Sequence, residues 1–493
     1  MTSAVSLETG GSFATTHATP VSYSWRSFMG PFPTEILRMI FKLVYQNHLK
    51  ELCWDTSYGQ TALRALWDLV NHDFASGTLF PYSLAAVCPS WCDILSSFPE
   101  FWTRVVISID ARPTPLSDVR SYLQWSRDLP ITVIVTRRDD KHEKDYTEEK
   151  NRVDAVIGCI SEQLFRCETL RVNVIYSSSL PQLRKHFRGE ALRLKNLLLE
   201  SADFGGVDVP DDTSQPLDIL DLRCPFVERL YVDGWNFRDV CVADPAAIRW
   251  NYHYSSYWFC QLQNLSDITI SRYKASENGG RGLSMKATLK ALAAMPRLHS
   301  LSIRAVEFDN TVIDRDSIGF EGLWSLDLQD LGPNALILFS RAIYTYTDAI
   351  AITRCHINFA ETFKCNNLTF SEIAKDQDFQ WLLKRWNGRE LDFVSCEGFN
   401  DDLIVSMGGG YGKGPFLCPR MHTLSLWDCT DFTFMELRRM CAARVAEAKE
   451  ELGEGVDVFD TPYNVSVRPL KVSVNGRRPE VGREEWRNGN VLG

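Results

Sequence analysis

The chain lacks the patterns on which a metal site, a disulfide framework or a membrane anchor would be built. Its 14 cysteines are spread over 493 residues without a Cys-x-x-Cys pair, and its 9 histidines form no His-x-x-x-His pair. No apolar run approaches the roughly 18 residues that a membrane-spanning helix requires, and residues 1–24 contain no apolar core of signal-peptide length. We therefore expect no metal, cofactor or membrane partner, and a reduced cytoplasmic or nuclear protein with free thiols.

Positive charge is also scarce. The chain has 53 Lys and Arg against 63 Asp and Glu, a net charge of −10. A nucleic-acid surface needs clustered basic side chains to neutralise phosphates, so we expect no nucleic-acid partner. The glycine-rich stretch before Lys413 is not a phosphate loop, because Met407 and Gly414 stand where glycine and Ser or Thr are required. Nor do the carboxylates suggest an acid–base pair, so we expect no catalytic residue.

Two apolar stretches near the N-terminus have the 3.6-residue period of short amphipathic helices. The first follows Pro33, which a helix tolerates in its first turn, and carries Ile36, Leu37, Ile40, Phe41 and Val44 on one face. The second carries Leu84, Val87, Trp91 and Ile94, and a break at Pro99 precedes Phe101 and Trp102. The pattern predicts a compact helical module with an aromatic plug.

The order and type of these residues resemble the F-box, which reads Leu-Pro-x-Glu-Ile, Ile-Phe, apolar-x-x-Val-Cys-x-x-Trp and Pro-x-Leu-Trp. The matching positions are Pro33, Glu35, Ile36, Ile40, Phe41, Leu84, Val87, Cys88, Trp91, Ile94, Pro99 and Trp102. The chain departs from the family at Phe32, which replaces leucine, at Pro89, and in an insertion at about residues 46–83. Such an insertion is tolerable, because loop-closure entropy grows only logarithmically with length.

The F-box resemblance implies docking on the Skp adaptor of a cullin–RING ubiquitin ligase. The residues that it assigns to adaptor binding are Phe32, Pro33, Ile36, Ile40, Phe41, Leu84, Val87 and Trp91. The remainder of the chain would then select a protein substrate. Alternatively, Trp91 and Trp102 are ordinary core residues of a helical hairpin.

After Trp102, short apolar runs alternate with helix-like stretches. Strands are expected at residues 105–109 and 131–135 on either side of a helix at 117–127. An apolar-x-x-apolar-x-apolar motif then recurs about 32 residues apart on average, against 20–29 in regular leucine-rich repeats. Its central residues are Leu170, Leu197, Leu230, Ile268, Leu301, Leu326, Ile350, Leu391 and Leu424. Helices are expected at residues 153–165, 283–295, 334–344 and 434–448.

Three copies of the motif continue into a cysteine at the same offset, at Cys355, Cys396 and Cys429. This resembles the Leu-x-Leu-x-x-Asn/Cys core of a leucine-rich repeat, in which the small polar residue bonds to neighbouring backbone. The resemblance implies an α/β fold, an irregular solenoid with a curved parallel sheet. A conventional α/β sheet would also give short apolar runs and is the alternative.

An aromatic cluster interrupts the array at residues 250–259. Its members Trp250, Tyr252, Tyr254, Tyr257 and Trp258 are candidates for substrate binding, because Trp and Tyr dominate interface hot spots. A buried insertion between repeats explains the same composition equally well.

These features predict a tail at residues 1–30, an F-box-like module at 31–104, a leucine-rich-repeat-like array at 105–475 and a polar tail at 476–493. The chain is expected to resemble F-box proteins of mushroom-forming fungi, as the substrate-recognition subunit of a Skp–cullin–F-box ubiquitin ligase without catalytic residues of its own. One alternative is a scaffold whose F-box remnant only caps the array. That alternative requires Ile36, Phe41, Leu84 and Trp102 to be buried. A second, an enzyme of unknown class, would need a constellation that the sequence does not offer.

Overall fold

The structure of the chain is a computed structural model. It describes residues 33–53, 79–137, 146–203, 222–242, 258–274, 282–309, 320, 322–343, 346–357, 363–412, 414–452 and 470–475. Contacts along these ranges define two compact units. The helical unit falls within Met1–His72 and Phe80–Ser97, and the sheet unit within Asp73–Leu79 and Phe98–Gly493. Both predicted tails, most of the predicted insertion and Phe32 lie outside the described residues.

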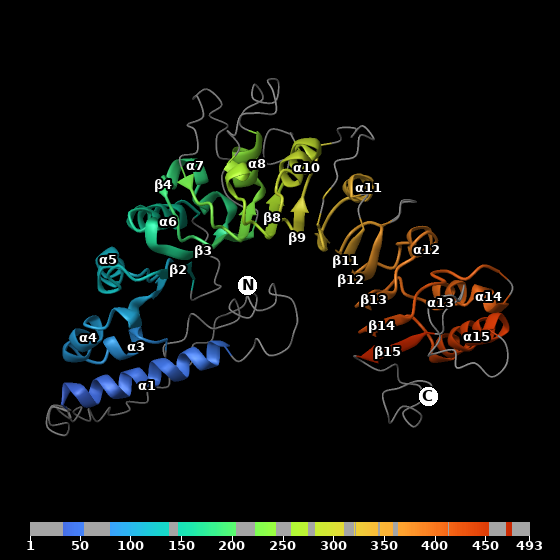
Figure 1. Cartoon of the computed structure of the whole chain (residues 1–493), viewed down its shortest axis with the longest axis horizontal. Helices are drawn as coiled ribbons and strands as arrows, with labels where there is room; N and C mark the ends of the chain where they lie inside the picture. Colours follow the sequence, from blue (N-terminus) through green and yellow to red (C-terminus); the bar gives the residue numbers. More distant parts are fainter. Residues whose placement is uncertain are drawn as a thin grey trace, which may run out of the picture. The chain divides into compact units, whose positions relative to one another are not determined.

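The helical unit consists of α1 (Thr34–Cys53), α3 (Tyr82–Ala85) and α4 (Pro89–Ser96), labelled in Figure 1. The first predicted helix is confirmed. The second is wrong as a single helix, because Cys88 is extended and α4 begins afresh with Pro89 in its first turn. Proline fits there because its missing N–H has no partner in the first turn of a helix.

A parallel sheet of 13 strands organises the sheet unit, in the order β1-β2-β3-β5-β7-β8-β9-β10-β11-β12-β13-β14-β15. The strands are β1 (Arg104–Ser108), β2 (Ile131–Thr136), β3 (Cys167–Tyr176), β5 (Asn196–Asp203), β7 (Arg229–Asp233), β8 (Asp267–Tyr273), β9 (Ser300–Val306), β10 (Ser325–Gln329), β11 (Thr347–Thr353), β12 (Cys365–Ser371), β13 (Glu390–Val394), β14 (Thr423–Trp427) and β15 (Lys471–Asn475). A second sheet pairs β4 (Gly189–Glu190) with β6 (Leu222–Arg223). Neighbours in the large sheet follow one another along the chain, whereas a doubly wound sheet reverses its order at a switch point.

The motif centres are in register from strand to strand. The aligned residues are Val105, Val133, Leu170, Leu197, Leu230, Ile268, Leu301, Leu326, Ile350, Leu368, Leu391, Leu424 and Val472. All are buried. Because side chains alternate between the faces of a strand, this ladder and the apolar residue two positions later form the core on one face.

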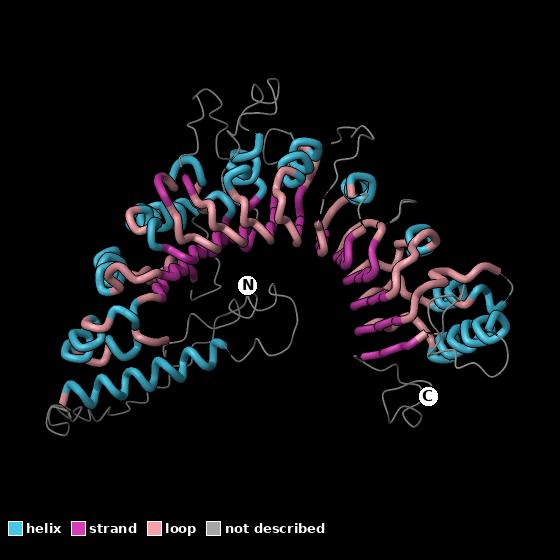
Figure 2. Tube along the Cα trace, in the orientation of Figure 1, coloured by secondary structure: helices cyan, strands magenta, loops and turns pink. Residues whose placement is uncertain are grey.

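Helices of the sheet unit cover that core face, and the described residues of this unit place none on the opposite face (Figure 2). The longer helices are α5 (Leu116–Trp125), α6 (Tyr146–Ser161), α8 (Gly234–Val242), α10 (Met285–Ala293), α11 (Pro333–Ala342), α13 (Asp401–Met407) and α15 (Phe434–Leu452). Shorter ones are η3 (Pro99–Trp102), η4 (Leu164–Arg166), η5 (Ser177–Ser179), α7 (Leu183–His186), α9 (Trp258–Gln261), α12 (Phe379–Leu383) and α14 (Gly409–Gly412). We call the uncovered side of the sheet the helix-free face.

From β8 to β14 each strand has a residue in the left-handed region at its C-terminal end, either next to last in the strand or directly after it. Non-glycine residues rarely adopt this conformation. These residues are Arg272, Ala305, Asp330, Arg354, Glu372, Ser395 and Asp428, with φ between 49° and 55°. The N–H of Asp330 donates to the carbonyl of Thr353 at 3.0 Å, and that of Arg354 to Ser371 at 3.0 Å. The turn therefore adds one bond to the ladder before the chain leaves the sheet.

Candidate functional site

Helix α1 carries apolar side chains on two faces. Leu37 and Phe41, four residues apart, are buried inside the helical unit. On an adjacent face of the helix, a row of apolar side chains is 40–61% exposed. We call this row the α1 stripe, and it consists of Ile36, Met39, Ile40, Leu43 and Val44. Exposed contiguous apolar surface of this kind marks an interaction site more often than scattered exposed residues do.

The inner face of α1 is fixed by aromatic packing within the helical unit. The ring of Phe41 meets that of Trp91 edge to face at 5.1 Å, and Tyr45 lies 5.4 Å from Phe80. Leu95 of α4 is fully buried as well. These contacts hold α1 with the stripe turned away from the core.

The residues assigned to adaptor binding therefore have different environments. Ile36, Ile40 and Val87 are exposed, and Pro33 is exposed at the start of α1. Leu84 and Trp91 are half-buried, while Phe41 is fully buried and supports the stripe from behind. The five residues predicted to share one apolar face of α1 divide between two environments. Leu37 and Phe41 are buried, whereas Ile36, Ile40 and Val44 are exposed.

The last piece of the F-box-like pattern, Pro99–Trp102, lies in the sheet unit. Trp102 is fully buried, stacked on Tyr122 at 5.1 Å and packed against Trp125 at 4.5 Å. Both partners belong to α5, which covers the beginning of the sheet. Trp102 is thus a core residue of the sheet unit.

The aromatic cluster at residues 250–259 contributes one described member among the five candidates, Trp258. Its side chain is 3% exposed, and its Nε1–H donates to the carbonyl of Leu222 at 3.0 Å. Trp258 is therefore part of the core and not available as an interface residue. Trp250, Tyr252, Tyr254 and Tyr257 lie outside the described residues.

The repeated cysteines are buried structural residues. Cys355 Sγ accepts from the Leu331 N–H at 3.3 Å, and Cys396 Sγ donates to the Phe370 carbonyl at 3.3 Å, so each bonds to the preceding strand region. Burial raises the pKa of both Cys355 and Cys396 to about 12. Because the thiolate is the reactive form, these thiols are poor nucleophiles at neutral pH.

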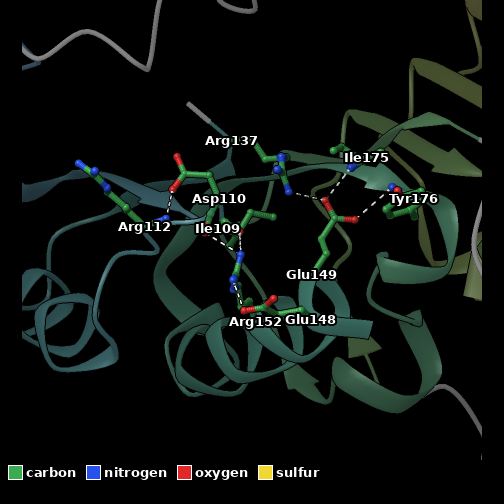
Figure 3. Close-up of polar contacts among 9 residues, drawn as sticks. All are labelled: Ile109, Asp110, Arg112, Arg137, Glu148, Glu149, Arg152, Ile175 and Tyr176. Atoms are coloured by element: carbon green, nitrogen blue, oxygen red, sulfur yellow. Dashed lines mark hydrogen bonds and ion pairs between the residues drawn. The ribbon is translucent and has the colours of Figure 1, made fainter. Parts of the chain in front are cut away.

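A cluster of carboxylate and guanidinium groups lies where β1, β2 and β3 end (Figure 3). Glu149 of α6 is fully buried and accepts hydrogen bonds from the N–H groups of Ile175 at 2.9 Å and Tyr176 at 3.1 Å. Arg137 pairs with the same carboxylate at 3.2 Å. Both carboxylate oxygens are thereby engaged, which suits a clamp between α6 and the end of β3 better than a proton acceptor.

Beside it, Arg152 of α6 is held by the loop that follows β1. Its Nη1 donates to the carbonyls of Ile109 at 3.2 Å and Asp110 at 2.7 Å, and its Nη2 pairs with Glu148. Asp110 Oδ1 accepts from the N–H of Arg112 at 2.9 Å. The cluster in Figure 3 therefore joins one helix to the ends of neighbouring strands through hydrogen bonds and ion pairs.

Neither a metal nor a membrane role is supported by the described part of the chain. It contains no group of three His, Cys, Asp or Glu side chains that could hold a metal ion. Among the helices in the described ranges, none is long and apolar enough to cross a membrane.

Comparison with known proteins gives no assignment. No protein-family model matches the chain, and no curated protein matches it either. The function is therefore inferred from the two surfaces described above, the α1 stripe and the helix-free face of the sheet.

Proposed function

We propose that the chain is the substrate-recognition subunit of a Skp–cullin–F-box ubiquitin ligase. The helical unit docks on the Skp adaptor through the α1 stripe and Val87, and a leucine-rich-repeat solenoid formed by the sheet unit holds a protein substrate. The observation that carries the proposal is the exposure of five large apolar side chains on one helix, at positions that include Ile36 and Ile40 of the F-box-like pattern.

The chain contributes binding and not chemistry in this proposal. Adaptor and cullin bring the ubiquitin-charged enzyme to a substrate held by the sheet unit. Holding two reactants together converts a bimolecular encounter into an effectively intramolecular one. Two features support the solenoid: strand neighbours follow chain order throughout the 13-stranded sheet, and the repeated cysteines bond to preceding backbone.

The alternative is a scaffold in which the F-box remnant only caps the repeat array. Phe41 and Trp102 are buried, as capping requires, whereas Leu84 is half-buried. Ile36 distinguishes the two interpretations, because capping would bury this side chain and it is 42% exposed. The exposed stripe therefore favours docking over capping.

Co-expression with the host's Skp adaptor tests the proposal. The chain should co-purify with the adaptor, and Ile36→Asp combined with Ile40→Asp should reduce recovery at least tenfold, because two carboxylates cannot be desolvated in an apolar interface. Met435→Asp is the matched control, since Met435 is 61% exposed on α15 of the sheet unit. Equal recovery of the double variant and the control would rule out docking through the stripe.

A further inference from the structure

The side chains on the helix-free face differ in charge and in exposure from strand to strand. Over β13 and β14 it carries Glu390, Asp392, Val394, Thr423, Ser425 and Trp427, which we call the β13–β14 patch. We propose that this patch binds an arginine-bearing extended segment of a protein partner. The inference rests on the proposed function, because it assigns the chemistry of the substrate that the sheet unit would recognise.

Strand geometry places the key side chains next to each other. In the parallel register, Asp392 lies opposite Ser425 and Val394 opposite Trp427. Trp427 is therefore the diagonal neighbour of Asp392, on strands about 4.8 Å apart. Trp427 is 47% exposed, the one large apolar residue in the strand β14 that is not buried.

The carboxylates of the patch differ from others on this face because they form no ion pair with a basic side chain in the described part of the chain. Elsewhere on this face, Glu200 pairs with Arg171 at 2.7 Å, and Asp327 pairs with Arg304 at 2.9 Å. Within the residues that the structure describes, no ion pair involves Glu390 or Asp392, and Asp392 accepts only from the Thr369 hydroxyl at 3.3 Å. The patch thus carries two carboxylates that form no ion pair among the described residues. Lys471 of β15 lies on the same face in register with Thr423, one strand beyond the patch, and pairs with neither of them.

Arginine is the side chain that fits both features at once. A guanidinium stacks on the face of an indole by cation–π attraction and binds a carboxylate through two parallel N–H···O bonds. Ser425 and Ser473, the next residues in register with Asp392, are small and leave the approach to the strands open. Lysine would keep the charge but lose the stacking and the paired bonds.

Fluorescence anisotropy with a defined peptide tests the inference on the full chain. The probe is a labelled nonapeptide of three Gly-Ser-Arg repeats, measured at about 150 mM salt, where loose surface attraction is screened. We expect saturable binding that Trp427→Ala and Asp392→Asn each weaken about threefold or more. Trp381→Ala is the control, because Trp381 is 57% exposed but belongs to α12 on the covered side.

Two outcomes overturn the inference. One is an equal affinity of the peptide for all three variants and the unchanged chain. The peptide would then be attracted by the net charge of −10 and not bound at the β13–β14 patch. The other is equal binding of a peptide in which glutamate replaces arginine. The peptide test is independent of the adaptor. If the chain binds the adaptor but not the peptide, only the inference about arginine binding is wrong. If the chain binds the peptide but not the adaptor, the ligase proposal is wrong and the β13–β14 patch is still a binding site.

Discussion

Several buried ionisable residues stabilise the fold through hydrogen bonds to defined partners. Arg444 is fully buried in α15 and donates to five backbone carbonyls, those of Met407, Leu417, Cys418, Pro419 and Met421. Burial lowers the pKa of Arg444 to about 10, so it stays protonated at neutral pH. A buried charge without such bonds would be strongly destabilising.

Glu149→Gln is expected to destabilise the sheet unit. The amide keeps one acceptor oxygen but places an N–H₂ group against a backbone N–H and removes the negative charge that faces Arg137. Leaving a buried donor and a buried cation poorly matched costs about 2–3 kcal/mol. Denaturant unfolding measures the loss, and Glu148→Gln is the control, because the Glu148 side chain is 53% exposed. A loss no larger than the control's would contradict the clamp.

Asp233 should make stability depend on pH. Burial raises its pKa to about 7 from 3.8, although hydrogen bonds from Asn236 oppose the shift. The folded chain then binds the proton more tightly than the unfolded chain, so this contribution is complete below pH about 4 and falls as pH rises to about 7. The slope is about 1.4 kcal/mol per pH unit, and the total at most about 4 kcal/mol.

Asp233→Asn mimics the protonated carboxyl and should remove this dependence, because its amide oxygen can still accept from Asn236. Unfolding curves of both proteins between pH 4 and 8 provide the measurement. Parallel stability profiles for the two would show that the carboxyl does not titrate in this range.

At the scale of elements, the period of apolar residues predicts the strands because each strand has one buried face. Every predicted motif centre lies in a strand and in register with its neighbours. The prediction leaves out β12, although Cys365, Leu368 and Phe370 fit the motif, and the two-residue strands β4 and β6. Leu368 follows its partner Ile350 by only 18 residues, well short of the average spacing.

The period of apolar residues predicts less about α1, because this helix has two apolar faces. Periodicity identifies the helix but does not say which of two adjacent apolar rows meets the core. Phe80 and Trp91, which lie far along the chain, decide this by packing on Tyr45 and Phe41. Likewise, composition does not show that Glu390 and Asp392 lack an ion-pair partner among the described residues, since pairing depends on strand register.

Substitutions on the two faces of α1 should therefore behave differently. Phe41→Ala removes a fully buried ring and should cost about 3–5 kcal/mol, opening the helical unit. Ile40→Asp, at an exposed position, should change stability by about 0.5 kcal/mol or less. Limited proteolysis reports the opening, with rapid cleavage expected near α1 for Phe41→Ala only. Equal protection of both variants would mean that Phe41 is not the anchor of α1.

At the scale of the whole molecule, the two proposed binding functions belong to different compact units. The helical unit carries the α1 stripe, and the sheet unit carries the β13–β14 patch on a face without helices in the described ranges. The core of the sheet unit runs as one cluster from Val105 to Val474. A subunit that must hold an adaptor and a substrate at the same time is well served by this separation.

Hydrogen–deuterium exchange of the full chain, with and without saturating purified Skp adaptor, tests the central claim most directly. Docking through the α1 stripe predicts slower exchange in peptides that cover residues 34–47 and 82–91, and unchanged exchange in β13 and β14. Only the amides at the contact become less accessible to solvent and open less often when the adaptor is bound. Unchanged exchange in α1, or protection confined to the sheet unit, would contradict the account.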